Sequence, residues 1–121
     1  MIQGFENETQ PLNEYELETL IPIMVRCLGR RVGVANAITN TEICRRMRGC
    51  GYEINDVRVR KIINYIRVNS LVSCLLATSK GYYVASNIDE VNDYIKSLEG
   101  REQAIRIVKE ALLEQVHVAT L

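Results

Sequence analysis

The sequence predicts an α+β fold, mainly α, made of one small domain with a helical extension. Two stretches, residues 13–29 and 56–69, repeat apolar residues every three or four positions, as helices with one buried face do. Two short apolar runs, residues 72–77 and 82–85, flank a Thr-Ser-Lys-Gly turn and predict a β-hairpin. The 121 residues leave no room for a second full core. We therefore expect residues 13–87 to form the domain and residues 88–121 to extend it.

The first helix is expected to begin at Asn13, after a flexible segment of residues 1–12. Asn13 and Glu16 have the spacing of an N-cap and its reciprocal partner. Pro22 should kink the helix or loosen the preceding turn, because proline has no N–H to donate. Gly29 is a plausible end. The predicted buried stripe is Leu17, Leu20, Ile21, Met24 and Leu28.

Two further helices should follow a short strand at residues 37–39. Asn40 or Thr41 is the expected cap of the second helix, which Gly49 and Gly51 end. Asn55 should cap the third helix, residues 56–69, where Asp56 suits the positive end of the helix dipole. Its buried face is predicted to hold Val59, Ile62, Ile63 and Ile66. In the hairpin, the adjacent Tyr82 and Tyr83 must point to opposite faces, one to the core and one outward.

The C-terminal part reads as two helical stretches, residues 88–98 and 101–115, with Gly100 weakening the helix between them. A seven-residue spacing joins both stretches, but Glu102 and Lys109 occupy the alternate seam positions and argue against a strong coiled coil. Two interpretations stay open: the stripe packs on the chain's own core, or it forms a homodimer interface. The stripe consists of Val91, Leu98, Ile105 and Leu112.

The charge is neutral overall but unevenly distributed. Residues 1–25 carry a net charge of −5, residues 26–80 carry +8, and residues 81–121 carry −3. A basic middle segment can form a local anion-binding face on a neutral protein. The apolar runs are too short to span a membrane and no basic apolar leader is visible, so we expect a soluble, cytoplasmic protein.

The sequence contains little that indicates a metal site or an enzyme active site. Cys27, Cys44, Cys50 and Cys74 form no CxxC pair, and His117 is the sole histidine, so we expect no metal and no disulfide. Cysteines of a reduced protein usually act as small apolar fillers. No paired carboxylates, nucleophile elbow or Gly-rich phosphate loop appears in the sequence. We therefore expect that the protein is not an enzyme and that it binds no cofactor and no small-molecule ligand.

Helix, short strand, helix, helix and hairpin is the element order of the winged helix-turn-helix. Residues 41–47 (TEICRRM) look like its supporting helix, residues 59–67 (VRKIINYIR) are similar to its recognition helix, and residues 80–84 (KGYYV) resemble its wing. The chain thus resembles the winged helix-turn-helix DNA-binding family, as found in small bacterial or prophage-type proteins. The resemblance implies that the third helix enters the major groove and that the wing, residues 78–83, lies on the adjacent backbone.

The candidate contacts follow from this placement. Arg58, Lys61 and Asn64 are spaced by three residues on the third helix and are the predicted base contacts. Arg60 and Arg67 have an alternative role, pairing with Glu14 or Glu18, and Tyr65 an alternative role in packing. The predicted backbone contacts are Thr41, Arg45, Arg46, Arg48, Asn55, Arg60, Tyr65 and Lys80.

The predicted function is double-stranded DNA binding, as a transcription regulator or an accessory replication factor of a mobile element. Palindromic sites reward two-fold symmetry, so a homodimer is a natural addition. The alternative is a protein–protein interaction module without DNA binding, because one fold supports many functions. The concentration of bases on the second and third helices favours DNA.

Overall fold

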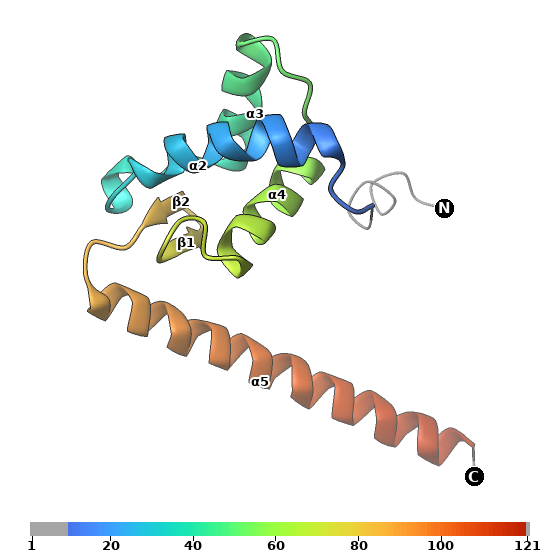
Figure 1. Cartoon of the computed structure of the whole chain (residues 1–121). Helices are drawn as coiled ribbons and strands as arrows, with labels where there is room; N and C mark the ends of the chain where they lie inside the picture. Colours follow the sequence, from blue (N-terminus) through green and yellow to red (C-terminus); the bar gives the residue numbers. More distant parts are fainter. Residues whose placement is uncertain (1–9, 121) are drawn as a thin grey trace. The chain divides into compact units, whose positions relative to one another are not determined.

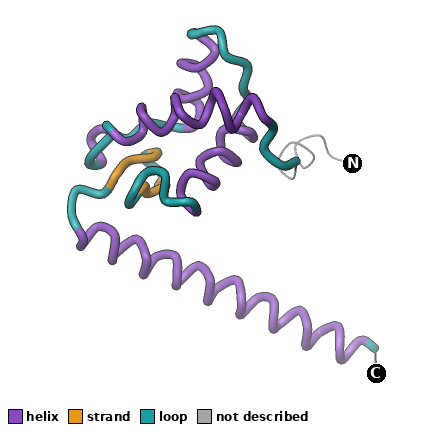
Figure 2. Tube along the Cα trace, viewed as in Figure 1, coloured by secondary structure: helices purple, strands orange, loops and turns teal. Residues whose placement is uncertain are grey.

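The computed structural model describes residues 10–120, which fall into two compact units, one ending at Ser86 and the other beginning at Asn87. The described part of the first unit holds three α-helices, a π-helical turn, a short 3-10 helix (η2, Val34–Asn36) and a small hairpin, and that of the second unit is a single helix (Figure 1). Figure 2 shows how little of the chain is strand. Helices account for 67% of the described residues, so the fold is α+β and mainly α, as predicted.

The first helix is irregular where the sequence predicts a kink. A π-helical turn, η1 (Glu16–Leu20), leads into α2 (Ile21–Gly29). The Ile21 N–H bonds to the Glu16 carbonyl, five residues back, one position before Pro22. The predicted cap is present: the Asn13 N–H donates to Glu16 Oε1 at 2.9 Å, and the Glu16 N–H donates to Asn13 Oδ1 at 2.8 Å.

The π-turn also changes which residues face the core. Leu17, predicted to be buried, is 40% exposed, whereas Glu16 is 4% exposed. A π-turn holds more residues than an α-turn, so positions before it are rotated relative to α2. Of the predicted flexible segment, residues 1–9 lie outside the described residues. Gln10 and Pro11 are instead held, because their carbonyls accept hydrogen bonds from Arg58.

The next two helices begin at side-chain caps. α3 (Asn40–Gly49) is capped by Thr39, whose Oγ1 accepts from the Glu42 N–H, and not by Asn40 or Thr41 as expected. The Asn40 side chain is engaged elsewhere, by Tyr82 and Asp56. α4 (Asp56–Val68) is capped by Asn55 as predicted, with Asn55 Oδ1 accepting from the Arg58 N–H at 2.9 Å.

The hairpin is smaller than the apolar runs suggested. β1 (Leu75–Thr78) pairs antiparallel with β2 (Gly81–Val84), and Thr78 faces Gly81 across the turn. The segment between α2 and α3 joins the hairpin: Ile38 and Tyr82 exchange two backbone hydrogen bonds of 3.0 and 2.8 Å. The strand predicted at residues 37–39 is thus reduced to a bridge at one residue, Ile38.

Gly81 is required at this crossing. Its φ is +117°, and a Cβ atom there would lie 2.5 Å from the Ile38 carbonyl oxygen. The core lies beneath the bridge, between the helices and one face of the hairpin. It consists of Leu20, Ile21, Met24, Leu28, Ile38, Ile43, Cys44, Met47, Ile54, Val59, Ile62, Ile63, Ile66, Val72 and Leu75. The four residues predicted as the buried face of α4 are all among them.

The second unit contains one continuous helix, α5 (Ile88–Ala119), where the sequence suggested two stretches. Asn87 caps it by accepting from the Glu90 N–H at 3.0 Å. The helix passes through Gly100, whose missing side chain lowers helix propensity without breaking the hydrogen-bonded ladder. Neither α5 nor any other helix of the described residues is long and apolar enough to cross a bilayer.

Candidate nucleic-acid interface

The outward face of α4 carries hydrogen-bond donors. Val59, Ile62 and Ile66 are completely buried, so the side of the helix opposite them faces solvent. Because each residue turns the helix by about 100°, Asn64 lies near the centre of the outward face, with Arg60 and Lys61 to either side. Arg60 and Asn64 are exposed, and Lys61 is half-buried. The face therefore presents two cations and one amide within about one helical turn.

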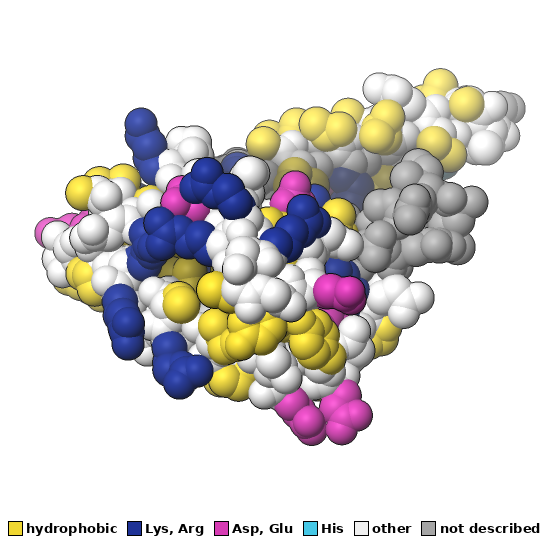
Figure 3. All heavy atoms as spheres, turned by 90° about the horizontal axis from the view of Figure 1, so that it is seen from above, with side chains coloured by type: hydrophobic (Ala, Val, Ile, Leu, Met, Phe, Trp, Pro, Cys, Tyr) yellow, Lys and Arg dark blue, Asp and Glu magenta, His cyan; other side chains and the backbone are white. Residues whose placement is uncertain are grey.

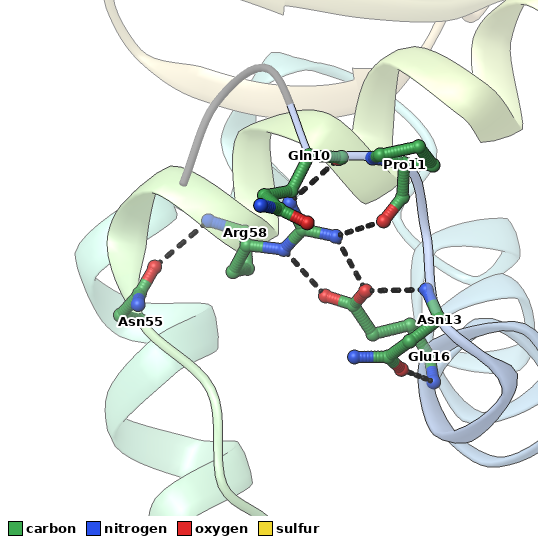
Figure 4. Close-up of polar contacts among 6 residues, drawn as sticks. All are labelled: Gln10, Pro11, Asn13, Glu16, Asn55 and Arg58. Carbon is green, nitrogen blue, oxygen red and sulfur yellow. Dashed lines mark hydrogen bonds and ion pairs between the residues drawn. The ribbon is translucent and has the colours of Figure 1, made fainter. Parts of the chain in front are cut away.

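Arg58, predicted as a base contact, does not lie on this face. Its guanidinium forms an ion pair with Glu16, with Nε 2.7 Å from Oε2 and Nη2 2.5 Å from Oε1 (Figure 4). The other guanidinium N–H groups donate to the carbonyls of Gln10 and Pro11 at 2.9 and 3.0 Å. The two side chains are only 11% and 5% exposed, so the Arg58 guanidinium is engaged within the protein and is not presented to solvent as a base contact would be. The spacing of three residues had placed Arg58 with Lys61, but it sits on the flank beside the first helix.

The ion pair is stabilised in its charged form. Burial alone would raise the pKa of Glu16, but hydrogen bonds from Arg58 and the Asn13 backbone N–H outweigh it and lower that pKa. The hydrogen bond to Glu16 raises the pKa of Arg58. The alternative role predicted for Arg60 and Arg67 was an ion pair with Glu14 or Glu18 of the first helix. The pair is formed by Arg58 and Glu16.

A polar chain links the hairpin to both helix starts. The Tyr82 hydroxyl donates to Asn40 Oδ1 at 3.0 Å, and Asn40 Nδ2 donates to the Asp56 carbonyl at 2.9 Å. Burial raises the pKa of the Tyr82 phenol, and the nearby guanidinium groups of Arg60 and Arg67 oppose that increase. These two arginines thus lie on the flank of α4 nearest β2. Of the tyrosine pair, Tyr83 is buried, as predicted for one of them, and Tyr82 is half-buried with its hydroxyl engaged.

The predicted backbone contacts on α3 differ in availability. Thr41 is exposed. Arg45 and Arg46 share the Glu42 carboxylate, at 3.3 and 2.9 Å, with 76% and 59% of their side chains exposed. Exposed pairs of this kind are weak, so both arginines can turn to a phosphate. Hydrogen bonds from Arg46 more than offset desolvation and lower the pKa of Glu42.

Arg48 and Asn55 have local structural roles. Arg48 Nε donates to the Ile54 carbonyl at 2.8 Å and so fixes the loop between α3 and α4. Asn55 Oδ1 is the cap of α4, which leaves only its amide group as a donor. Tyr65 is 37% exposed and lines a groove of about 370 Å³ with Leu12, Leu17, Lys61, Asn64, Val68 and Asn69.

A second basic cluster lies on α2 and α3. The charge of Arg31, at the end of α2, acts on Glu42 together with those of Arg45 and Arg46. Arg26 and Arg30 are exposed on the same end of α2. Figure 3 shows Lys and Arg side chains spread over this side of the molecule, with acidic groups between them. The α2 arginines were not among the predicted DNA contacts, although three bases within six residues are a visible signal in the sequence.

The wing and the C-terminal stripe are placed as follows. Lys80 is exposed at the hairpin turn, where its backbone N–H donates to Thr78 Oγ1 at 3.1 Å. Along α5, Leu98, Ile105 and Leu112 are 41%, 69% and 55% exposed, and Val91 is half-buried. No residue of α5 is classed as buried.

The cysteines differ from the expected role as apolar fillers. Cys44 alone is buried, and burial raises the pKa of its thiol to about 11, whereas Cys27, Cys50 and Cys74 are exposed. Within residues 10–120, no group of three or more His, Cys, Asp or Glu side chains is arranged to hold a metal ion. In comparisons with known proteins, no family model, no curated protein and no solved structure matches this chain.

Proposed function

We propose that this chain is a winged helix-turn-helix protein that binds double-stranded DNA, with α4 in the major groove and the hairpin turn on the adjacent backbone. The observation that carries the proposal is the outward face of α4, with Arg60, Lys61 and Asn64. The major groove admits a helix, where Arg and Lys pair with guanine and Asn with adenine. Lys61 and Asn64 remain the proposed base contacts, and Arg60 takes the place of Arg58.

The arrangement of elements supports the same proposal. The segment before α3 pairs with β2 through Ile38, which gives the order helix, short strand, helix, helix and hairpin. The link from Tyr82 through Asn40 to Asp56 holds the hairpin against the starts of α3 and α4. A rigid link of this kind keeps the groove-binding helix and the wing in one register, as DNA binding requires.

Thr41, Arg45, Arg46 and Lys80 are the proposed phosphate contacts. With three cations on phosphates, the slope of log affinity against log salt is about −2.7, so affinity falls roughly 40-fold from about 50 to 200 mM salt. We propose a role in transcription regulation or as an accessory replication factor of a mobile element, acting in the cytoplasm and without a catalytic reaction. A homodimer through α5 would present two α4 helices to a palindromic site.

One observation favours the alternative, a protein-interaction module. The groove beside Lys61 and Tyr65 is partly apolar, because Leu17 and Val68 are 40% and 73% exposed along it. Exposed apolar patches rimmed by polar groups are typical of protein-binding surfaces. A peptide or helix of a partner protein would occupy the same face of α4 that we assign to DNA.

Fluorescence anisotropy with a random duplex of about 30 base pairs, at two salt concentrations, tests the proposal. The variant Arg60→Ala/Lys61→Ala/Asn64→Ala should bind at least tenfold more weakly, because it removes both cations and the amide of the α4 face. The control Arg26→Ala/Arg30→Ala removes two exposed cations from α2 and should change the affinity less than threefold.

Three results would contradict the proposal. A larger loss in the α2 variant than in the α4 variant would move DNA to the basic cluster of α2 and α3. Binding unaffected by the α4 substitutions would remove α4 from the interface. No binding of the folded protein at low salt would favour the protein-interaction module.

A further inference from the structure

α5 presents apolar side chains for which its own unit offers no partner. It has 32 residues, so it is about 48 Å long. Ile105, Val108 and Val116 are 69%, 60% and 60% exposed. Most helical stability in proteins comes from packing of an apolar face, and a long helix with exposed Leu, Ile and Val is expected to bury them against another helix.

The apolar residues of α5 follow a heptad pattern over its whole length. One seam position, d, holds Val91, Leu98, Ile105, Leu112 and Ala119, all apolar. The other, a, holds Ile88, Ile95, Glu102, Lys109 and Val116. The two charged residues sit in neighbouring heptads near the middle of the helix. Charged residues at seam positions are unfavourable in most coiled coils. A partner helix must therefore be placed so that Glu102 and Lys109 are compensated.

We propose that α5 pairs with α5 of a second copy of this chain in an antiparallel coiled coil, with Ile88 opposite the partner's Ala119. Antiparallel pairing places each a residue opposite a d residue. In this register the two helices overlap along their whole length, with Val91 opposite the partner's Val116 and Ile95 opposite the partner's Leu112. The inference deepens the homodimer named above; it rests on that part of the proposed function and does not require DNA.

The two seam charges decide the direction. In a parallel pair, Glu102 would face the partner's Glu102, and Lys109 the partner's Lys109, which buries like charges together. In the antiparallel pair, Glu102 faces the partner's Ile105, and the partner's Lys109 lies in the next layer. Each Glu102 can then pair with a Lys109 across the seam, and two-fold symmetry forms this pair twice.

The flanking charges favour the same direction. In a parallel pair the g residue Arg101 would lie next to the partner's e residue Arg106, which is repulsive. Antiparallel pairing brings e residues together instead, so Glu99 faces the partner's Arg106, again twice. Within one helix Arg106 contacts Glu102 at 3.3 Å, but these side chains are 62% and 71% exposed, and such a contact is easily exchanged.

Disulfide trapping of the full-length chain, without DNA, tests the direction. The three exposed cysteines, Cys27, Cys50 and Cys74, are first changed to Ser. Ile95→Cys and Leu112→Cys proteins, one with an N-terminal tag, are then oxidised separately and as a mixture. The antiparallel pair predicts cross-linking in the mixture alone, because like positions lie roughly 25 Å apart along the axis. Cross-linking of each protein alone would show a parallel pair and overturn the proposal.

Charge reversal gives a second test on the chain with its native cysteines. Arg106→Glu faces the partner's Glu99 in the antiparallel pair and should raise the dimer dissociation constant at least tenfold by sedimentation equilibrium. In a parallel pair it faces the partner's Arg101 and should tighten the dimer. The double variant Glu99→Arg/Arg106→Glu should restore dimerisation within threefold.

The outcomes separate this inference from DNA binding. A wild-type chain that stays monomeric at all accessible concentrations overturns the dimer, whatever its affinity for DNA. A dimer that tightens with Arg106→Glu, or is insensitive to it, overturns the antiparallel direction. Loss of DNA binding in the α4 variant leaves both readouts unchanged, since none of the substituted α4 residues belongs to α5.

Discussion

Replacing Arg58 with Ala should destabilise the first unit strongly and should not act as a simple loss of a DNA contact. The Glu16 side chain is 5% exposed and would keep the Asn13 N–H as its one remaining donor among the contacts described above. Removing one member of a buried ion pair typically costs about 3–5 kcal/mol, because the other charge stays buried without compensation. Such a loss is a large part of the whole stability of a domain this size.

Urea denaturation at low temperature, followed by tyrosine fluorescence, measures this loss. Of the six tyrosines, only Tyr94 lies in α5, so the signal reports on the first unit. The matched control is Arg60→Ala, which removes an exposed arginine from the same helix and should change the free energy of unfolding by less than about 0.5 kcal/mol.

A double variant separates charge burial from packing. Glu16→Leu/Arg58→Leu removes both charges and should recover most of the stability lost in Arg58→Ala. The reasoning is refuted if Arg58→Ala unfolds at the wild-type urea concentration, or if the double variant is less stable than Arg58→Ala by more than about 1 kcal/mol.

Three other predictions concern acid stability and two glycines. The folded-state pKa of Glu16 lies below its ordinary value of about 4.5, so the stability that ionised Glu16 gives the fold is complete above that pH and is lost as the pH falls through the lowered pKa. Glu16→Gln should therefore flatten the decrease of the free energy of unfolding with pH in this window, as measured by acid unfolding. Gly81→Ala should cost more than about 2 kcal/mol in urea unfolding, since its Cβ would meet the Ile38 carbonyl; an unchanged midpoint would contradict this. Gly100→Ala meets nothing within 4 Å and should stabilise α5 by about 0.5–1 kcal/mol, seen as a higher thermal midpoint by circular dichroism at 222 nm.

The helices and the hairpin were predictable because local signals define them. The Asn13 and Asn55 caps, the apolar stripe of α4 and the turn before Gly81 each act over a few residues and are found where the sequence places them. The continuity of α5 was less evident, because a single glycine lowers propensity by an amount that the rest of a long helix outweighs.

The candidate site was only partly predictable. Lys61 and Asn64 follow from the helical period, but the spacing of three residues, taken alone, placed Arg58 with them. Glu16, the partner of Arg58, is 42 residues away in the sequence and lies buried at the start of the π-turn η1. Neither the width of that turn nor a contact over this separation is encoded in a local pattern. The cluster of Arg31 with Arg45 and Arg46 depends on tertiary packing in the same way.

The Arg58–Glu16 pair also restricts how this sequence can evolve. Loss of either charge alone leaves its partner buried and uncompensated, so a viable lineage must pass through a destabilised intermediate or change both positions nearly together. We therefore expect the two positions to covary in any set of relatives, as acid with base or as two apolar residues. The neighbouring Arg60 and Asn64 carry no such constraint and can vary with the DNA sequence that the protein would read.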